Sequence, residues 1–206
     1  FVGSRGLGDV YKRQAHNFIL KKKWSKKPFE LTTSLTNKTV GIVGMGEIGK
    51  AFSKRVKSLS MKIVYFGPNK KKLKYKYFKN LKDMASVIDV MVITCIGGRK
   101  TKDLINKTIF KLMKPSSIIV NVSRGSVINE VHLLDALNKN LISGAALDVF
   151  EMEPKINNKF LKLKNVLLSP HNGSATFETR LRMAKISSQN ISNYLYSKKL
   201  KNKVRY

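Results

Sequence analysis

Short apolar runs separated by amphipathic stretches recur along most of the chain. Strands are expected at residues 39–43, 61–66, 77–78, 89–94, 117–122, 141–146 and 166–168. Helical periodicity lies between them, at residues 50–59, from residue 81, and at 102–113, 129–138 and 176–196. Continuous apolar runs are typical of strands covered on both faces, and alternation of strands with helices indicates a parallel sheet. The pattern predicts an α/β fold with a doubly wound parallel sheet of the Rossmann type.

A glycine-rich turn joins the first predicted strand to the first long helix. Gly44, Gly46 and Gly49 form a G-x-G-x-x-G motif with a buried strand before it and a helical period after it. The first glycine permits a tight turn, the second lets a pyrophosphate approach the backbone, and the third lets helix and strand pack closely. The helix N-terminus also presents N–H groups to phosphates. We therefore expect a dinucleotide to bind at Gly44, Gly46, Glu47, Ile48 and Gly49.

The chain is very basic, with 41 Lys and Arg against 12 Asp and Glu and a net charge of +29. Such an excess can indicate binding to nucleic acid or to an anionic membrane, but it also arises from a lysine-rich surface. The basic runs at 21–27, 70–76 and 198–203 are dispersed and accompany no nucleic-acid-binding motif. We expect neither nucleic acid nor membrane as a partner. No apolar run is long enough to span a bilayer, and the single Cys95 forms no internal disulfide, which favours a cytoplasmic protein.

Polar side chains follow three of the predicted strands, at the edge of the sheet where ligands bind in such folds. Arg124 follows one strand, the acidic residues Asp148, Glu151 and Glu153 follow the next, and His171 follows the last. An arginine at this edge can hold a substrate carboxylate and polarise its carbonyl group. A histidine can supply the proton, and a carboxylate can orient its imidazole. The set predicts a site that reduces a keto acid, and we expect no metal there.

From residue 15 to the C-terminus, the sequence resembles the D-isomer-specific 2-hydroxyacid dehydrogenases. The matching stretches are residues 37–49, 121–125, 145–154 and 169–176. The resemblance implies that Arg124 binds the substrate, that Glu153 partners the histidine and that His171 is the acid/base. It implies that Asp148 contacts the nicotinamide amide. Further cofactor contacts are expected at Cys95, Ile96, Thr101, Val122, Ser123, Arg124, His171 and Gly173.

The end of the second predicted strand bears on the choice of cofactor. NAD-selective sites of this type place an Asp or Glu there to bind the ribose hydroxyls. Here Gly67 stands at that position, and lysines follow it. Because no carboxylate repels a 2′-phosphate and several cations attract it, NADP(H) is favoured over NAD(H), with Asn69 and Lys70 as phosphate contacts. NADP-preferring members of the family often carry an arginine where Pro68 stands.

Residues 94–101 bear on the substrate. They resemble the Pro-Gly-Gly variant of some NADP-dependent glyoxylate/hydroxypyruvate reductases, with Ile96 in place of the proline. The resemblance implies a small 2-keto acid, with glyoxylate or hydroxypyruvate favoured. Two alternatives stay open. One is a dinucleotide-sensing corepressor, which shares this fold and similar Arg, Glu and His residues; the other is a basic Rossmann protein that binds nucleic acid.

The resemblance also predicts how the chain is organised. Residues 1–14 have no periodicity and are expected to be a non-native leader; residues 15–35 are expected to be a remnant of an inter-domain helix and linker. Residues 36–170 would be the dinucleotide-binding domain, and 171–206 a helix returning toward the substrate domain. In the family, half of the substrate domain precedes the position of residue 15. We expect a truncated chain that binds cofactor but turns over poorly, and a homodimer at full length.

Overall fold

The computed structural model describes residues 15–29, 31, 33–200 and 202. The predicted leader at residues 1–14 lies outside the described residues. The chain divides into two compact units, Phe1–Pro170 and His171–Tyr206, which are described separately. In the first unit, residues 15–20 are helical and precede the sheet.

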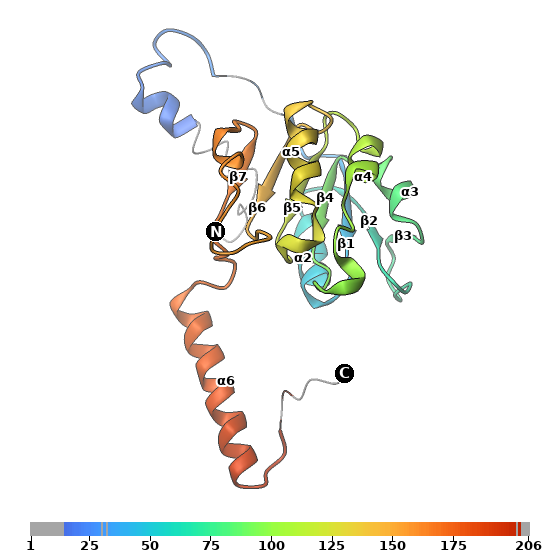
Figure 1. The fold of residues 1–206 in the computed structure, drawn as a ribbon, viewed down its shortest axis with the longest axis vertical. Helices are drawn as coiled ribbons and strands as arrows, with labels where there is room; N and C mark the ends of the chain where they lie inside the picture. Colours follow the sequence, from blue (N-terminus) through green and yellow to red (C-terminus); the bar gives the residue numbers. More distant parts are fainter. Residues whose placement is uncertain (1–14, 30, 32, 201, 203–206) are drawn as a thin grey trace. The chain divides into compact units, whose positions relative to one another are not determined.

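A seven-stranded parallel sheet forms the centre of the first unit (Figure 1). Its strands are β1 (Thr39–Val43), β2 (Lys62–Phe66), β3 (Lys76–Phe78), β4 (Val90–Ile93), β5 (Ile118–Asn121), β6 (Gly144–Leu147) and β7 (Val166–Leu168). They are ordered β3-β2-β1-β4-β5-β6-β7, and every neighbouring pair is parallel. The strand order therefore reverses between β1 and β4, and ligands of doubly wound sheets bind at the carboxyl ends of the strands beside such a point. The predicted Rossmann architecture is confirmed.

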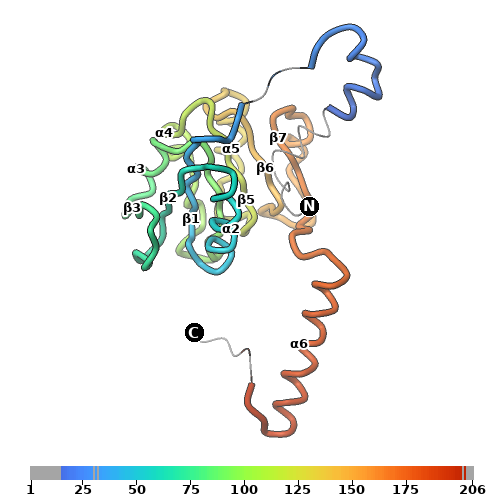
Figure 2. Tube along the Cα trace, turned by 180° about the vertical axis from the view of Figure 1, so that it is seen from behind, coloured from blue at the N-terminus to red at the C-terminus, as the bar shows by residue number. Residues whose placement is uncertain are grey.

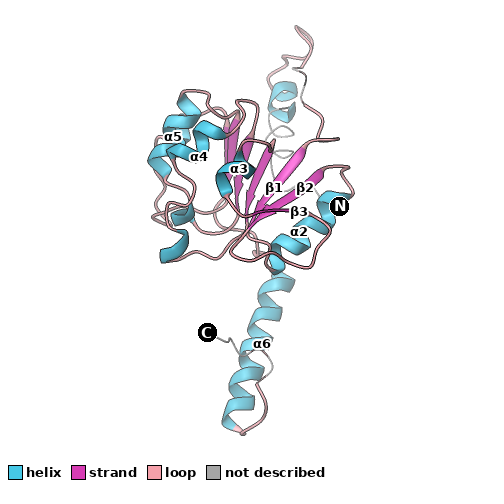
Figure 3. Ribbon diagram, turned by 90° about the vertical axis from the view of Figure 1, so that its right-hand side faces the viewer, coloured by secondary structure: helices cyan, strands magenta, loops and turns pink. Residues whose placement is uncertain are grey.

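Helices cover both faces of this sheet. They are α2 (Glu47–Lys57), α3 (Leu81–Ala85), α4 (Lys107–Leu112) and α5 (Glu130–Asn138), with short 3₁₀ turns η1 (Arg99–Thr101), η2 (Gly125–Val127) and η3 (Phe160–Lys162). Opposite views show α4 and α5 on one face and α2 on the other (Figures 1 and 2), and the edge-on view adds α3 to the side of α4 and α5 (Figure 3). Among the labelled helices of the first unit, α2 is thus the one on its face of the sheet, and it directly follows β1, one of the two strands at which the order reverses.

Two hydrophobic clusters correspond to these two faces. Val56 of α2 packs in a cluster with Ile42 and Tyr65 of the neighbouring strands. Phe110 of α4 and Leu133 of α5 belong to the larger cluster on the other face, and both side chains are fully buried. Each buried side chain of this size contributes about 1.5–3 kcal/mol relative to exposure, so the strands are stabilised from both sides.

Two predicted elements begin several residues later than their apolar pattern suggests. The helix expected at 102–113 begins only at Lys107, because Ile105 instead forms a parallel bridge with Ile128 and Asn106 caps the helix by accepting from Thr108 N at 3.0 Å. The strand expected at 141–146 begins at Gly144. Leu141 does not join the strand, because its N–H donates to the Ala136 carbonyl of α5 at 2.9 Å.

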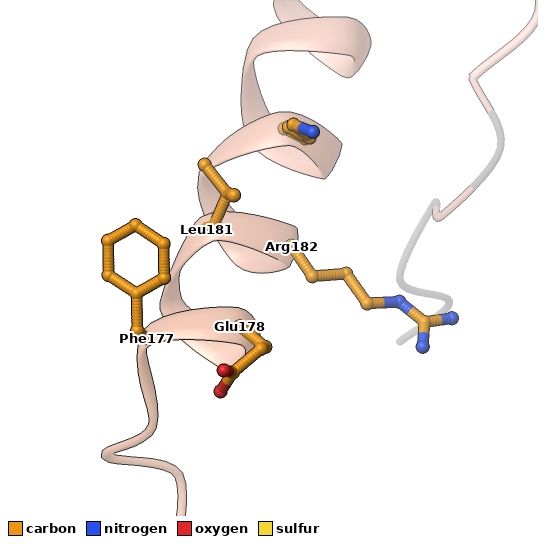
Figure 4. Close-up of a pocket in the computed structure, with 5 residues that line it drawn as sticks. Phe177, Glu178, Leu181 and Arg182 are labelled. Atoms are coloured by element: carbon orange, nitrogen blue, oxygen red, sulfur yellow. The ribbon is translucent and has the colours of Figure 1, made fainter.

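The second unit is dominated by α6 (Phe177–Leu195), which begins after the cap residue Thr176. Most of its side chains are exposed, and a pocket on the helix itself is lined by Phe177, Glu178, Leu181, Arg182 and Lys185 (Figure 4). Within the described part of the chain, no helix has the length and apolar character that a bilayer crossing requires.

Candidate functional site

The turn between β1 and α2 is fixed by two glycines that pack against protein atoms. Gly44 has φ +99°, and a Cβ there would lie 2.5 Å from the Cys95 Cα. A Cβ on Gly49 would collide with the Gly44 carbonyl oxygen and lie 3.1 Å from Thr94 Oγ1. Thr94 Oγ1 donates to the same Gly44 oxygen at 2.7 Å. The first and third glycines of the motif therefore pack the turn against the residues that follow β4.

Gly46 differs from these two glycines, because a Cβ there would meet no protein atom within 4 Å. It is the N-cap residue of α2 and makes no side-chain cap hydrogen bond. The other labelled α-helices of the described residues are capped by the side chains of Asn80, Asn106, Asn129 and Thr176. The first N–H groups of α2, at Glu47 and Ile48, therefore receive no side-chain cap from Gly46, and the space beside Gly46 is open. This end of the helix fits a pyrophosphate.

The loops after β4 and β5 are joined through Ser123. Ser123 Oγ donates a short hydrogen bond to the Cys95 carbonyl, and its backbone N–H donates to Asn121 Oδ1 at 3.1 Å. Asn121 Nδ2 in turn donates to the Arg124 carbonyl at 3.0 Å. Burial raises the pKa of the Cys95 thiol.

The side chain of Arg124 is held along the same loop. A Cβ on Gly97 would lie 2.5 Å from the Arg124 Cγ, so the arginine stem passes directly over this glycine. The guanidinium donates to the Ser123 carbonyl at 2.7 Å, and the residue as a whole is exposed. Sequence reasoning assigned Arg124 but missed Gly97, whose requirement depends on a contact between two loops.

Gly125 brings the loop after β5 against the loop after β6. A Cβ at this position would overlap the backbone of Phe150 and Glu151. In the facing loop, Glu153 Oε1 accepts from the Phe150 N–H at 2.9 Å, and Glu130 Oε1 accepts from the Glu151 N–H at 2.8 Å. The structure therefore brings together the loops that carry the predicted substrate arginine and the predicted acidic partner.

Asp148 joins the ends of β6 and β7. Its backbone N–H donates to the Asn121 carbonyl at 3.0 Å, and its Oδ1 accepts from Ser169 Oγ at 2.6 Å. Ser169 N–H donates to the Leu147 carbonyl at 2.9 Å, which fixes the serine in register. Ser169 begins one of the stretches that resemble the family, residues 169–176, but only the structure shows that it hydrogen-bonds to the Asp148 carboxylate.

The other predicted cofactor contacts lie around the same edge. Thr101 Oγ1 donates to the Ile96 carbonyl at 2.7 Å, which closes the loop after β4, and the Ile96 side chain is exposed. Val122 follows β5, Asn69 and Lys70 follow β2, and all three are exposed. Because these residues follow the carboxyl ends of parallel strands, they can reach a ligand at the switch point. Their roles as cofactor contacts stay predictions.

His171 and Gly173 belong to the second unit and directly follow the strand end of the first. His171 has φ +49°, a left-handed conformation that is uncommon for residues other than glycine and that occurs at functional sites. Both residues are exposed. The acid/base role of His171 and its partnership with Glu153 stay predictions.

A family model described as D-isomer specific 2-hydroxyacid dehydrogenase, NAD binding domain, matches residues 11–173. Glyoxylate/hydroxypyruvate reductase A of Arabidopsis thaliana is 34% identical over 188 residues, which cover 91% of this chain and 60% of that protein. Glyoxylate reductase of Pyrococcus furiosus is 40% identical over 172 residues, which cover 82% of this chain and 51% of that protein. The chain therefore spans between half and two thirds of the length of these curated relatives.

Solved structures agree with this likeness. A 2-hydroxyacid dehydrogenase from Ketogulonicigenium vulgare matches with a TM-score of 0.90 at 27% identity, covering 95% of this chain and 63% of that one. An NADPH-dependent glyoxylate/hydroxypyruvate reductase from Sinorhizobium meliloti, in complex with NADP and malonate, matches with a TM-score of 0.86 at 31% identity. That match covers 90% of this chain and 59% of the other.

Proposed function

Because this chain belongs to the D-isomer-specific 2-hydroxyacid dehydrogenase family, we propose that its protein reduces a small 2-keto acid with NAD(P)H. Glyoxylate and hydroxypyruvate are the favoured substrates, since relatives reduce these compounds according to their names. The observation that carries the proposal is the contact of Gly125 with the Phe150 backbone. This contact sets the Arg124 loop beside the Glu153 loop, at the same sheet edge as the uncapped end of α2.

The reaction needs one hydride and one proton, which together convert the keto group into a hydroxyl group. NAD(P)H supplies the hydride when it is bound. Arg124 pairs with the substrate carboxylate, and its charge polarises the adjacent carbonyl. His171 donates the proton to the carbonyl oxygen, and the Glu153 carboxylate, anchored on the Phe150 N–H, orients and stabilises the charged imidazole.

The preferred cofactor in this proposal is NADP(H). The segment after β2, residues 67–75, contains no carboxylate and four lysines. A 2′-phosphate there would meet positive charge and no opposing anion. Binding of NADP by the Sinorhizobium meliloti enzyme supports the same preference. The homodimer and the cytoplasmic location expected from the sequence stay predictions.

Turnover is the test of this function. The 206-residue chain, joined to the N-terminal segment of a relative, is assayed for NADPH oxidation with glyoxylate and with hydroxypyruvate. His171→Asn should lower kcat by roughly 10²–10⁴-fold, the usual contribution of a general acid. His16→Asn, which changes an exposed histidine of the helical residues 15–20, is the matched control and should leave kcat unchanged.

Two results would contradict the proposal. An equal loss of kcat in the His171 and His16 variants would contradict the role of His171 as proton donor. Tight NADPH binding without turnover of any small 2-keto acid would instead favour a dinucleotide-sensing protein.

A further inference from the structure

Two tyrosine hydroxyls hold the segment that follows β2. Tyr65 is fully buried, and its hydroxyl accepts from the Lys71 N–H at 2.8 Å and lies 3.3 Å from the Lys71 carbonyl. The Tyr77 hydroxyl, on β3, donates to the Gly67 carbonyl at 3.0 Å. The two rings lie 5.3 Å apart, so the two attachments belong to one packed unit. Each hydroxyl bonds to the backbone of the segment and not to another side chain.

Residues 68–70 form an exposed arch between these two attachments. Gly67 at one end is buried, whereas Pro68, Asn69 and Lys70 are exposed. The proline ring fixes one backbone dihedral angle of the arch. The strand before the arch is tied to the glycine turn, because the Gly44 N–H donates to the Phe66 carbonyl at 2.9 Å. The arch is therefore set at a defined place beside the predicted pyrophosphate site.

We propose that Tyr65 and Tyr77 are positioning residues that select NADP(H) over NAD(H) by holding the arch around the ribose 2′-phosphate. This inference rests on the proposed preference for NADP(H). A lysine on a mobile loop loses much conformational entropy when it binds a phosphate, and a loop that is already ordered loses less. The tyrosines reduce that loss for Asn69 and Lys70 without touching the cofactor themselves.

The ring and the hydroxyl of Tyr65 have separate roles. Its ring packs in the cluster beneath α2, and phenylalanine keeps this packing. Among the described residues the hydroxyl bonds to the Lys71 backbone, and Lys71 is exposed, so water can replace the lost partner. Tyr65→Phe should therefore fold, and it removes this attachment selectively. Tyr77→Phe likewise keeps the ring, which is half-buried, and removes the hydrogen bond to the Gly67 carbonyl.

The experiment measures dissociation constants of NADPH and NADH for the 206-residue chain by fluorescence titration. Tyr65→Phe and Tyr77→Phe should each weaken NADPH binding roughly three- to tenfold, the net value of about one hydrogen bond, and leave NADH binding unchanged. Tyr75→Phe is the matched control, because Tyr75 lies in the same segment and packs on the same cluster. It should change neither constant.

A double-mutant cycle distinguishes positioning from general support of the fold. If Tyr65 acts through the arch, Tyr65→Phe should add little to the loss of NADPH affinity once Lys70 is replaced by alanine. Equal weakening of NADPH and NADH binding, or full additivity with Lys70→Ala, would overturn the positioning role. A wild-type chain that binds both cofactors equally would overturn the NADP(H) preference as well, so the two failures are distinguishable.

Discussion

Alanine at Gly46 and alanine at Gly49 should have opposite effects, although both glycines belong to one turn. A Cβ on Gly46 meets no protein atom within 4 Å, and the extended backbone there, with φ −82° and ψ −160°, accepts any residue. A Cβ on Gly49 collides with the backbone oxygen of Gly44. Gly46→Ala should therefore keep the fold and lose the cofactor, whereas Gly49→Ala should destabilise the fold.

The expected magnitudes follow from these surroundings. At Gly46, alanine is a poorer N-cap than glycine by about 0.5–1 kcal/mol, but it restricts the unfolded chain by about 0.4–1 kcal/mol, so the two effects nearly cancel. At Gly49, the overlap is with a backbone oxygen that cannot swing away, so it costs about 2–3 kcal/mol, and the better helix propensity of alanine returns about 1 kcal/mol. A net loss of about 1–2 kcal/mol lowers the Tm of a chain of this size by roughly 2–8 °C.

Thermal denaturation and NADPH titration of the two variants test the reasoning. G46A should keep the wild-type Tm within about 2 °C and bind NADPH at least about tenfold more weakly, since its methyl group occupies the space of the pyrophosphate. G49A should show the lower Tm. A G46A variant with wild-type affinity for NADPH would refute the close approach of the pyrophosphate to Gly46.

The remaining predictions concern Asp89 and Gly67. Burial acts to raise the pKa of Asp89, but the Thr39 N–H at 2.8 Å and Lys114 at 2.9 Å hold it below its ordinary value of 3.8. The charged Asp89 therefore stabilises the fold above pH 3.8, and this stabilisation is lost as the pH falls through the pKa of the folded state. D89N should lower the free energy of unfolding by about 1–2 kcal/mol at pH 7 and change it little in acid, as measured by urea denaturation. A Cβ on Gly67 meets no atom within 4 Å, so G67D should fold and should reverse the preference toward NADH; retained NADPH preference in titrations would contradict this.

The sheet was predictable because its signal is local. The bounds of β1 and β7 agree with the sequence prediction, since the first apolar run ends at the glycine of a turn, Gly44, and the second at the polar Ser169. Residues 102–106 could not be assigned correctly, because their apolar positions fit a helix and the bridge between Ile105 and Ile128 depends on a distant segment. Local periodicity predicts an element, and tertiary pairing decides where it begins.

The glycine turn of the candidate site has a local signal as well, whereas the roles of its polar residues stay predictions. The spacing of Gly44, Gly46 and Gly49 indicates the turn, and the positive φ of Gly44 and the contact of Gly49 with the Gly44 oxygen arise within it. Gly97 and Gly125 are required only because other loops pass over them, and the hydroxyl of Tyr65 has a role only through a segment six residues away. Such contacts are properties of the assembled edge and leave no periodic signal in the sequence.

The few acidic residues explain why the high net charge alone does not indicate a polyanion partner. Among the described residues, Glu47, Asp89 and Asp135 pair with lysines, and Glu130, Asp148 and Glu153 accept hydrogen bonds at the carboxyl edge of the sheet. None lies in residues 67–75, where an acid would select against a 2′-phosphate. These six carboxylates are held by a backbone or lysine partner, whereas the four lysines of residues 67–75 have no acid within their own segment. In this chain the informative feature of the charge is the position of the missing acid, and that position is what supports the proposed preference for NADP(H).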